Sequence, residues 1–415
     1  MKFDVLGLLA ACSYALDCVE AELIKVTNNH SKRVAYMAVC TAEKMGIQGQ
    51  SLQDLAECAL LHDNAVAQYI QEELQNDALR NGVTKLGRHC TIGEKILKNI
   101  PFHNDVSNVI LYPPHENADG SEPFGKQWNE VPFFARIIHM CDTIDIFCRS
   151  MKSDSDEWKR TEEFVIKSKD KLFDSFCVEV FFNAFSDEKI HMIDNETLDT
   201  MLWKKVPRIK LELNFAQIKA IADLFAHIVD YKSPFTSNHS MGVAEGAEKI
   251  SRFMGFDEDI CQKMYIAGAL HDIGKVAIGN EILEKPEKLT DEEFKTMKHH
   301  AVYTYYILSG IDDFEEIRDW AALHHEKLNG KGYLFGKTAD ELNKPERIMA
   351  CIDIYQALTE DRPYKKGLSH DKACGILDDM AQKGFVDSDI SNKIRDCFGS
   401  MQRYNLFIHV CDSIM

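Results

Sequence analysis

Apolar residues recur at every third or fourth position along most of the chain, the spacing that places them on one face of an α-helix. In one such stripe, Ile260, Met264 and Ala267 are followed four residues later by His271. Because residues four apart share a helix face, this histidine is expected to point into the interior of a helical bundle.

A second helix is expected to begin at Thr290, where the sequence TDEE forms a capping box. Its apolar stripe of Phe294 and Met297 leads to His300, which is therefore expected to face the interior as well. The stretch from Phe3 to Val19 is also apolar and predicts a first core helix.

Sustained alternation of apolar and polar residues between hairpin turns, the pattern of β-sheets, is not found in the sequence. We therefore expect an all-α fold. The polar stretch from Ser186 to Asn195 predicts a connection, and the sequence ETLDTMLWKK predicts a helix that continues it. The glycine-rich sequence NGKGYLFG, from Asn329 to Gly336, predicts a loop.

A ladder of isolated histidines closed by an aspartate occurs twice in the chain. The first copy consists of His30, His62, His89, His115 and Asp142, and the second of His239, His271, His300, His325 and Asp353. The second histidine of each copy begins a His-Asp doublet, and the flanking sequences agree, since NHSKRVA mirrors NHSMGVA and ALLHD mirrors GALHD. A period of about 210 residues is too long for a solenoid, so it indicates duplication of a whole domain.

The repeat divides the 415 residues into two tandem helical-bundle domains, residues 1–206 and 207–415, each long enough for its own core. Thirteen cysteines without a CxxC pair lie largely on apolar stretches. They predict buried free thiols in a reducing compartment, so a cytoplasmic location is expected. The apolar N-terminal stretch carries Asp4 and Asp17, which fits neither a signal peptide nor a membrane span.

The formal net charge of −18 argues against a nucleic-acid polymer as partner, because such binding requires a basic surface. A small anionic ligand remains compatible with this charge if cationic side chains are concentrated locally.

The repeated histidines and aspartates have the chemistry of metal ligands. A single histidine on an apolar stripe is more often a core residue, but the second copy combines a His-Asp doublet, the pair His324-His325 and a downstream Asp353. Neutral imidazole and carboxylate are the usual donors for iron, manganese, zinc or nickel. Five histidines with two aspartates suit a site for two metals, which would activate water for an in-line phosphoryl displacement.

The second half resembles the HD-GYP family, a branch of the HD phosphohydrolases that hydrolyses cyclic dinucleotides at a centre of two or three metals. The resemblance covers about Leu211 to the C-terminal region. Its motifs are HDIGKVAI, MKHHAVYTYYIL, HHEKLNGKGY and RIMACIDIYQALTEDRPYKKG.

The resemblance implies roles for individual residues. The metal ligands it implies are His239, His271, Asp272, His300, His324, His325 and Asp353. Asp272 and Lys275 are the catalytic residues it implies, with Lys275 contacting the scissile phosphate. The residues that it implies hold the substrate are Lys275, Tyr333, Arg362 and Lys365.

Several positions depart from the family pattern. Leu334 replaces the proline of the GYP triplet, and Asn329 stands where the family usually has aspartate. Gln356 replaces the aspartate of a common DAL segment, which puts an outer contact of the metal site in doubt. Phe235 stands where members with three metals have a glutamate. We therefore expect two divalent ions, iron or manganese, with nickel and zinc as alternatives.

The first copy keeps fewer of these groups. Pro114 replaces the first of the paired histidines, and Val66 stands where the second copy has Lys275. The residues that remain for residual metal binding are His30, His62, Asp63, His89, His115 and Asp142. We expect a noncatalytic domain that regulates or scaffolds the other, and its histidines are either residual ligands or relics held by packing.

The function expected is a metal-dependent phosphodiesterase of bacterial second-messenger signalling. It would hydrolyse cyclic di-GMP in the first instance, or 3′,3′-cyclic GMP-AMP, to a linear dinucleotide, and whether this is cleaved further to mononucleotides is left open by the sequence. Three alternatives stay open: an HD phosphohydrolase acting on other nucleotides, an inactive cyclic dinucleotide sensor, and an interaction scaffold. Signalling proteins and a second copy of the chain are further candidate partners, and a membrane is not expected.

Overall fold

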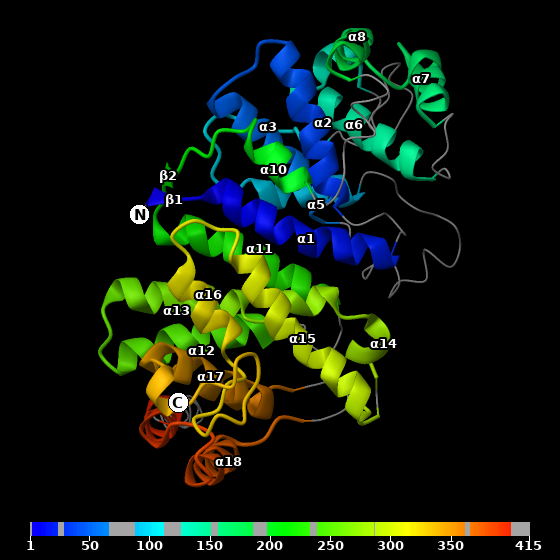
Figure 1. Cartoon of the computed structure of the whole chain (residues 1–415). Helices are drawn as coiled ribbons and strands as arrows, with labels where there is room; N and C mark the ends of the chain where they lie inside the picture. Colours follow the sequence, from blue (N-terminus) through cyan, green and yellow to red (C-terminus); the bar gives the residue numbers. More distant parts are fainter. Residues whose placement is uncertain are drawn as a thin grey trace, which may run out of the picture. The chain divides into compact units, whose positions relative to one another are not determined.

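The computed structural model describes residues 2–23, 29–65, 88–111, 126–150, 157–185, 197–232, 239–285, 287–361 and 366–399. These residues are mainly helical, which confirms the all-α prediction (Figure 1). One short antiparallel ladder is present, in which β1 (Lys2–Phe3) pairs with β2 (Leu211–Glu212). No helix in this part of the chain is both long and apolar enough to cross a membrane.

The chain divides into two compact units, Met1–Ile221 and Ala222–Met415, and the division falls within α11 (Phe215–Lys232). The helices of unit 1 are α1 (Val5–Leu23), α2 (His30–Lys44), α3 (Gln50–Leu60), α5 (Arg88–Leu97), η2 (Trp128–Glu130), α6 (Phe133–Ser150), α7 (Glu157–Ser168), α8 (Ser175–Ala184) and α10 (Leu198–Trp203). The predicted first core helix is α1, and α10 lies within the predicted ETLDTMLWKK helix. The predicted connection at Ser186–Asn195 is outside the described residues.

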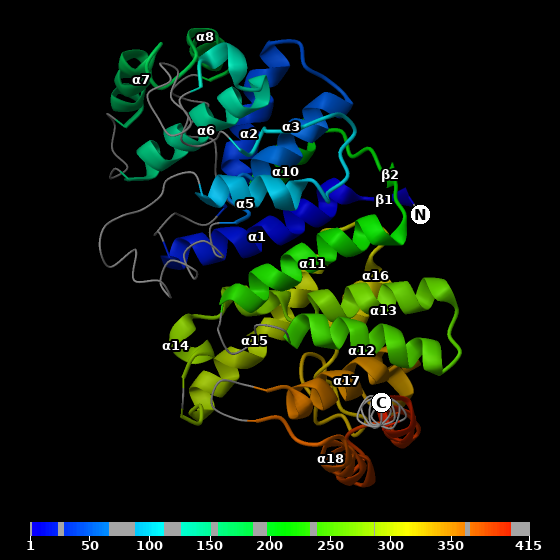
Figure 2. The same cartoon turned by 180° about the vertical axis from the view of Figure 1, so that it is seen from behind.

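Unit 2 contains a corresponding series of helices. They are α12 (His239–Phe253), α13 (Glu258–Leu270), η3 (Ile273–Ala277), α14 (Asn280–Leu283), α15 (Asp291–Leu308), α16 (Glu315–Ala322), η4 (Ala339–Glu341), α17 (Lys344–Thr359) and α18 (His370–Gln382). In this unit α12 packs against both α13 and α17. In unit 1, α2 packs in the same way against α3 and α6, as can be followed in Figure 2. In each unit, the helix that begins with the first histidine of the ladder, His30 or His239, therefore packs against two other helices.

A capping box determines where the helix that carries His300 begins. Thr290 caps α15 with its side chain, and Glu293 completes the capping box, as predicted. The expected apolar stripe is wrong at Phe294, whose side chain is 47% exposed, with the Lys298 amine 4.8 Å from the ring centroid. The acidic first turn of α15 lies in solvent, so burial begins only further along the helix and includes His300.

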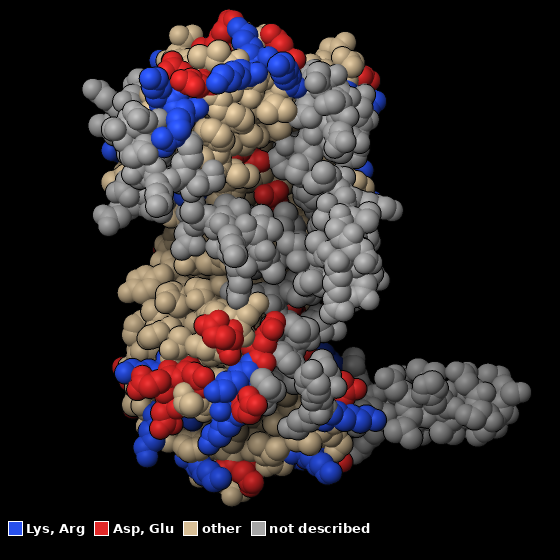
Figure 3. Space-filling view, turned by 90° about the vertical axis from the view of Figure 1, so that its right-hand side faces the viewer, with Lys and Arg blue, Asp and Glu red and all other residues tan. Residues whose placement is uncertain are grey.

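Charged side chains of both signs are interspersed on the described surface. On the face shown in Figure 3, lysines and arginines lie among aspartates and glutamates rather than in one continuous basic area. This distribution accompanies the net charge of −18.

A buried ion pair fixes the start of α2 in unit 1. Arg33 is only 1% exposed, and its Nε and Nη2 atoms each donate to Asp145 of α6 at 2.7 Å. Asp145 also accepts from Nδ1 of His30 at 2.8 Å. Burial would raise the pKa of Asp145, but His30 and Arg33 outweigh it and hold this pKa below its ordinary value.

Asp145→Ala is expected to destabilise unit 1 by about 3 kcal/mol or more, because a buried guanidinium loses its carboxylate. Arg33→Met/Asp145→Ala should be less destabilised than the single variant, since no buried guanidinium is left without a carboxylate. Urea unfolding with hydrogen exchange in α2 measures both. A double variant less stable than Asp145→Ala would contradict the assignment of the loss to an uncompensated charge.

Candidate metal centre

The His-Asp doublet of unit 2 lies where α13 ends. Asp257 caps the start of this helix, accepting from the backbone of Ile260, and His271 is its C-terminal cap residue. The chain then enters the tight turns of η3. His271 and Asp272 are 0% and 3% exposed, so the end of the helix delivers both side chains into the interior.

Three histidines of unit 2 are oriented by the same local contact. Nδ1 of His271 lies 2.7 Å from the carbonyl of Gly268, and the Nδ1 atoms of His300 and His324 lie 2.6 Å from the carbonyls of Met297 and Ala321. Each carbonyl is three residues earlier in the chain. A ring that donates from Nδ1 carries the lone pair on Nε2, the tautomer that can bind a metal.

The Nε2 atoms of these three histidines and of His239 converge on two carboxylates, those of Asp272 and Asp353. Asp272 lies 3.1 Å from Nε2 of His271 through Oδ2, and 3.5 Å from Nε2 of His300 through Oδ1. Asp353 of α17 lies 3.2 Å from Nε2 of His239. Among the described residues, the Nε2 atoms of His271, His300 and His324 and Oδ1 of Asp272 are buried without a hydrogen-bond partner.

Three overlapping groups of donor atoms in unit 2 are close enough to hold a metal ion. The groups are His239, His271 and Asp353; His271, Asp272 and His324; and His300, His324 and His325. Buried polar atoms normally have partners, so this many converging lone pairs fit the chemistry of a divalent cation. The structure thus brings together all seven residues that the sequence singled out as ligands.

The electrostatics of the cluster favour the ligand forms of most of its groups. Burial lowers the pKa of His324 to about 3, and burial likewise lowers the pKa values of His300 and His325. For Asp272, burial would raise the pKa, but His271 and Lys275 hold it well below its ordinary value. Neutral imidazoles beside ionised carboxylates are the protonation states that bind metals. His239 differs: burial would lower its pKa, but the carboxylates of Asp353 and Glu360 outweigh burial and raise the pKa to about 9.

Lys275 and Tyr333 lie at this cluster. Nζ of Lys275 is 2.5 Å from Oδ2 of Asp272, and its side chain is 23% exposed. The ring of Tyr333 is 4.6 Å from that of His325, centroid to centroid. His325 is the most exposed of the seven candidate ligands, with 28% of its side chain accessible. The cluster is therefore accessible on the side where Tyr333 lies.

The loop that carries Tyr333 is organised around one carboxylate. Glu326 is buried and accepts hydrogen bonds from the backbone of Phe335, Gly336 and Lys337. Leu334, in place of the family's proline, has φ of 117°, which a proline ring cannot adopt. The substitution of this proline therefore accompanies a different backbone path beside Tyr333.

Gly332 is also required by close packing. A Cβ at this position would lie 2.4 Å from the backbone nitrogen of Lys327. Only glycine allows the loop to approach its own start so closely.

Several positions from the sequence analysis lie outside the described residues. They are Val66, Pro114, His115, Phe235, Arg362 and Lys365, together with the side chain of His89.

One contact of the site was not anticipated from the sequence. Oε2 of Glu360, at the C-terminal end of α17, lies 3.0 Å from Nδ1 of His239. Two turns of helix separate Glu360 from Asp353, so both carboxylates fall on one face of α17. The seven-residue spacing from Asp353 was the available signal in the sequence, and it does not by itself say which residue Glu360 contacts.

Unit 1 assembles a smaller cluster. His30, His62 and Asp63 form one group that could hold a metal ion. Asp142 lies 3.1 Å from Nε2 of His30 and 3.6 Å from Nε2 of His62. His62 repeats the local contact of its counterpart, with Nδ1 2.8 Å from the carbonyl of Ala59. The described part of unit 1 therefore has the geometry of a possible metal site, with fewer donor atoms than the cluster of unit 2.

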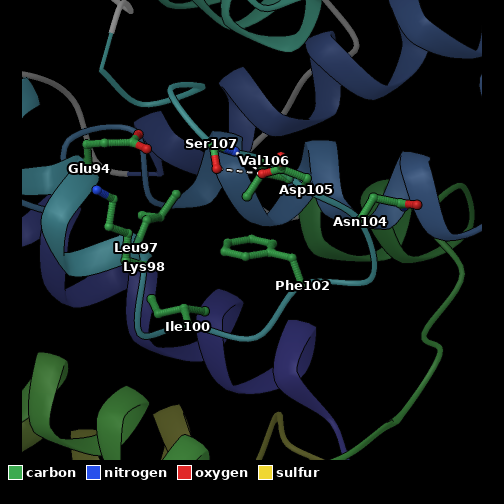
Figure 4. A pocket seen from close by; sticks show the side chains of 9 residues that line it. All are labelled: Glu94, Leu97, Lys98, Ile100, Phe102, Asn104, Asp105, Val106 and Ser107. Carbon is green, nitrogen blue, oxygen red and sulfur yellow. Dashed lines mark hydrogen bonds between the residues drawn. The ribbon is translucent and has the colours of Figure 1, made fainter.

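A cavity of about 210 Å³ in unit 1 is separate from that cluster. It lies between the end of α5 and the following turn (Figure 4). Its lining includes Glu94, Lys98, Phe102 and Asp105, and none of the clustered histidines or aspartates. Oε1 of Glu94 accepts from the backbone of Asn108 at 2.6 Å, so this carboxylate closes the turn.

Comparison with known proteins finds one protein family and several relatives. The family model described as HD domain matches residues 19–163 and 223–390. A 3′,3′-cGAMP-specific phosphodiesterase of Vibrio cholerae is 29% identical over 418 residues, which cover 95% of this chain and 91% of that protein. A second cGAMP-specific phosphodiesterase of the same organism is 31% identical over 73% of this chain and 66% of its own length.

Shorter matches include a cyclic di-GMP phosphodiesterase response regulator of Xanthomonas campestris, 34% identical over 38% of this chain and 42% of that protein. A solved structure of a cyclic GMP-AMP-specific phosphodiesterase of Vibrio cholerae has the same fold, with a TM-score of 0.68. It is 23% identical, and the match covers 96% of this chain and 98% of that one.

His300→Ala is expected to lower the divalent metal bound by anaerobically purified protein, because it removes a buried donor from the centre of the cluster. His299→Ala is the matched control, since the neighbouring side chain is exposed. Elemental analysis per mole of folded protein measures both. Equal metal content in His300→Ala and the parent protein would show that this histidine is not a ligand.

Proposed function

The chain belongs to the HD-domain family, and from this membership and the geometry of unit 2 we propose that it is a metal-dependent phosphodiesterase that hydrolyses cyclic dinucleotides. The convergence of seven histidine and aspartate side chains carries this proposal, together with the buried Nε2 atoms of His271, His300 and His324 that have no hydrogen-bond partner among the described residues. The family match supports the resemblance to HD phosphohydrolases that the motifs indicate.

Two divalent ions, iron or manganese, would be held by the unit 2 cluster. The proposed ligands are His239, His271, Asp272, His300, His324, His325 and Asp353. The three overlapping donor groups extend over more positions than one ion needs, which supports two ions. When bound, such ions activate water as a nucleophile and neutralise charge on the reacting phosphate.

The side chains around the cluster would orient the phosphodiester. Lys275 lies at Asp272 and is partly exposed, so its ammonium group can meet a phosphate oxygen while it remains beside the carboxylate. A fixed cation that meets the developing charge contributes strongly to catalysis. Tyr333 would contact the substrate on the accessible side of the cluster. Arg362 and Lys365 are proposed as further cationic contacts on the basis of the family motif.

The preferred substrate is proposed to be 3′,3′-cyclic GMP-AMP, with cyclic di-GMP as the alternative. The sequence motifs alone place cyclic di-GMP first. The two relatives that match most of the chain are named for cGAMP, and this supports the mixed dinucleotide. The products would be a linear dinucleotide and then mononucleotides.

Unit 1 is proposed to be a noncatalytic domain that regulates unit 2. The boundary predicted from the repeat, residues 1–206 and 207–415, stays a proposal. Unit 1 keeps a three-residue donor group, but the sequence has Val66 where unit 2 has Lys275. Residual metal binding by His30, His62, Asp63, His89, His115 and Asp142 remains a proposal. A cytoplasmic location is also proposed, because the described cysteines form no disulfide bond with one another.

Asp272→Asn is expected to reduce kcat/KM for cyclic dinucleotide hydrolysis by more than about 100-fold, because it replaces a proposed carboxylate ligand of the metal. Loss of a residue that only contacts a ligand usually costs less than this. The matched control is Asp63→Asn, the same change in the first copy, which should leave unit 2 chemistry in place. Both are assayed anaerobically with Mn(II) or Fe(II) and with cyclic GMP-AMP and cyclic di-GMP in parallel.

Turnover that survives in Asp272→Asn but is lost in Asp63→Asn would place the chemistry in unit 1 and overturn the proposal. Tight nucleotide binding without turnover in the metal-replete parent protein would instead identify a sensor.

Lys275→Met is expected to lower kcat about 100-fold, since it removes one cation that would face the reacting phosphate. Bound metal should be retained, because Lys275 donates no lone pair to the site. Steady-state kinetics and elemental analysis of the same preparation test both parts. Unchanged kcat would contradict a role at the phosphate, whereas lost metal would indicate that Lys275 only holds Asp272 in place.

A further inference from the structure

The two copies hold their first ladder histidine in different ways. In unit 1, Nδ1 of His30 contacts Asp145, three residues after Asp142 on α6, and Arg33 donates two hydrogen bonds to the same carboxylate. In unit 2, the carboxylate at Nδ1 of His239 is Glu360, seven residues after Asp353 on α17. The imidazole contact is therefore kept while the residue that supplies it changes.

The positions that form the ion pair in unit 1 have both changed in unit 2. Gly242 follows His239 by three residues, as Arg33 follows His30, and Gln356 follows Asp353 by three, as Asp145 follows Asp142. A Cβ on Gly242 would lie 2.2 Å from the side-chain nitrogen of Gln356. The Gln356 amide thus occupies the space next to residue 242, and an arginine could not fit beside it in this conformation.

Among the described residues, the carboxylate of Glu360 pairs with His239. Its side chain is 9% exposed, and that of His239 is 4% exposed, so their contact is largely shielded from water. The opposite ring nitrogen of His239 lies 3.2 Å from Asp353. A line of hydrogen-bonding groups therefore runs from Glu360 through the imidazole to the metal cluster.

We propose that Glu360 is a positioning residue of the metal centre, which orients His239 in place of the aspartate–arginine pair used by unit 1. The inference rests on the proposed function only in taking His239 as a metal ligand. His271, His300 and His324 donate from Nδ1 to neutral backbone carbonyls, whereas His239 donates to a carboxylate.

A carboxylate at Nδ1 fixes the tautomer and makes Nε2 a stronger donor than a carbonyl would. A metal ion held by His239 would therefore depend partly on Glu360. Loss of the negative charge of Glu360 would weaken the binding of that ion without removing any ligand atom.

Glu360→Gln is expected to weaken Mn(II) binding to the full chain by about 10- to 100-fold, the usual cost of losing an outer carboxylate at a metal-bound histidine. The affinity is measured by titrating metal-free protein with Mn(II) and following free Mn(II) by electron paramagnetic resonance. Asp361→Asn is the matched control, because this neighbouring carboxylate accepts from the backbone of Gly367 and does not face the cluster.

A rescue experiment separates positioning from a purely structural role at the end of α17. Gly242→Arg/Gln356→Asp transfers the unit 1 arrangement to unit 2 and supplies another carboxylate for Nδ1 of His239. In this background Glu360→Gln should cost less than threefold in Mn(II) affinity. A structural role would produce the same loss in both backgrounds, and that result would overturn the proposal.

The measurement in the native background decides the question even if the transferred pair does not fold. Unchanged Mn(II) affinity in folded Glu360→Gln would overturn the proposal by itself. Because the readout is metal affinity, it is independent of whether cyclic dinucleotides are hydrolysed. A protein that binds Mn(II) through His239 and Glu360 yet cleaves no cyclic dinucleotide would refute the proposed function and leave this inference standing.

Discussion

The burial of histidine nitrogens and aspartate oxygens without protein partners is the constraint on which the rest of the second unit depends. Removing such atoms from water without a hydrogen bond is costly, and several of them share one interior space. Short local contacts hold the rings there, because each Nδ1–carbonyl bond joins two residues that are three apart in the chain. A divalent cation would satisfy the remaining lone pairs together and convert an unfavourable cluster into a stabilised centre.

The two units are more alike in this arrangement than in its surroundings. His62 and His271 are oriented by the same carbonyl contact, three residues earlier in each chain segment. Around the preceding histidine, however, unit 1 has a buried ion pair, and unit 2 has Gly242, Gln356 and a more distant glutamate. Such an exchange is compatible with the same ring orientation, because the contact at Nδ1 depends on the distance of the acceptor from the ring, whichever turn of the helix supplies it.

The loop at Tyr333 illustrates where motif reasoning is limited. The missing proline is visible in the sequence, and greater freedom of φ follows from it directly. The direction in which Leu334 uses that freedom depends on Glu326, which gathers three backbone donors from the loop. The error at Phe294 has a similar origin, since an apolar residue in register with the core is exposed when its helix turn extends past the bundle.

The sequence by itself determined the all-α class and the identity of the clustered histidines and aspartates, and it indicated a domain duplication that stays a prediction. Helical period and capping act over a few residues wherever the helices pack, and the two His-Asp doublets can be read directly from the sequence. Only the tertiary structure decided that Glu360 faces His239, because the two lie 121 residues apart and meet through the packing of α12 against α17. No spacing rule distinguishes that glutamate from other acidic residues, since contact across two helices depends on how their faces are brought together.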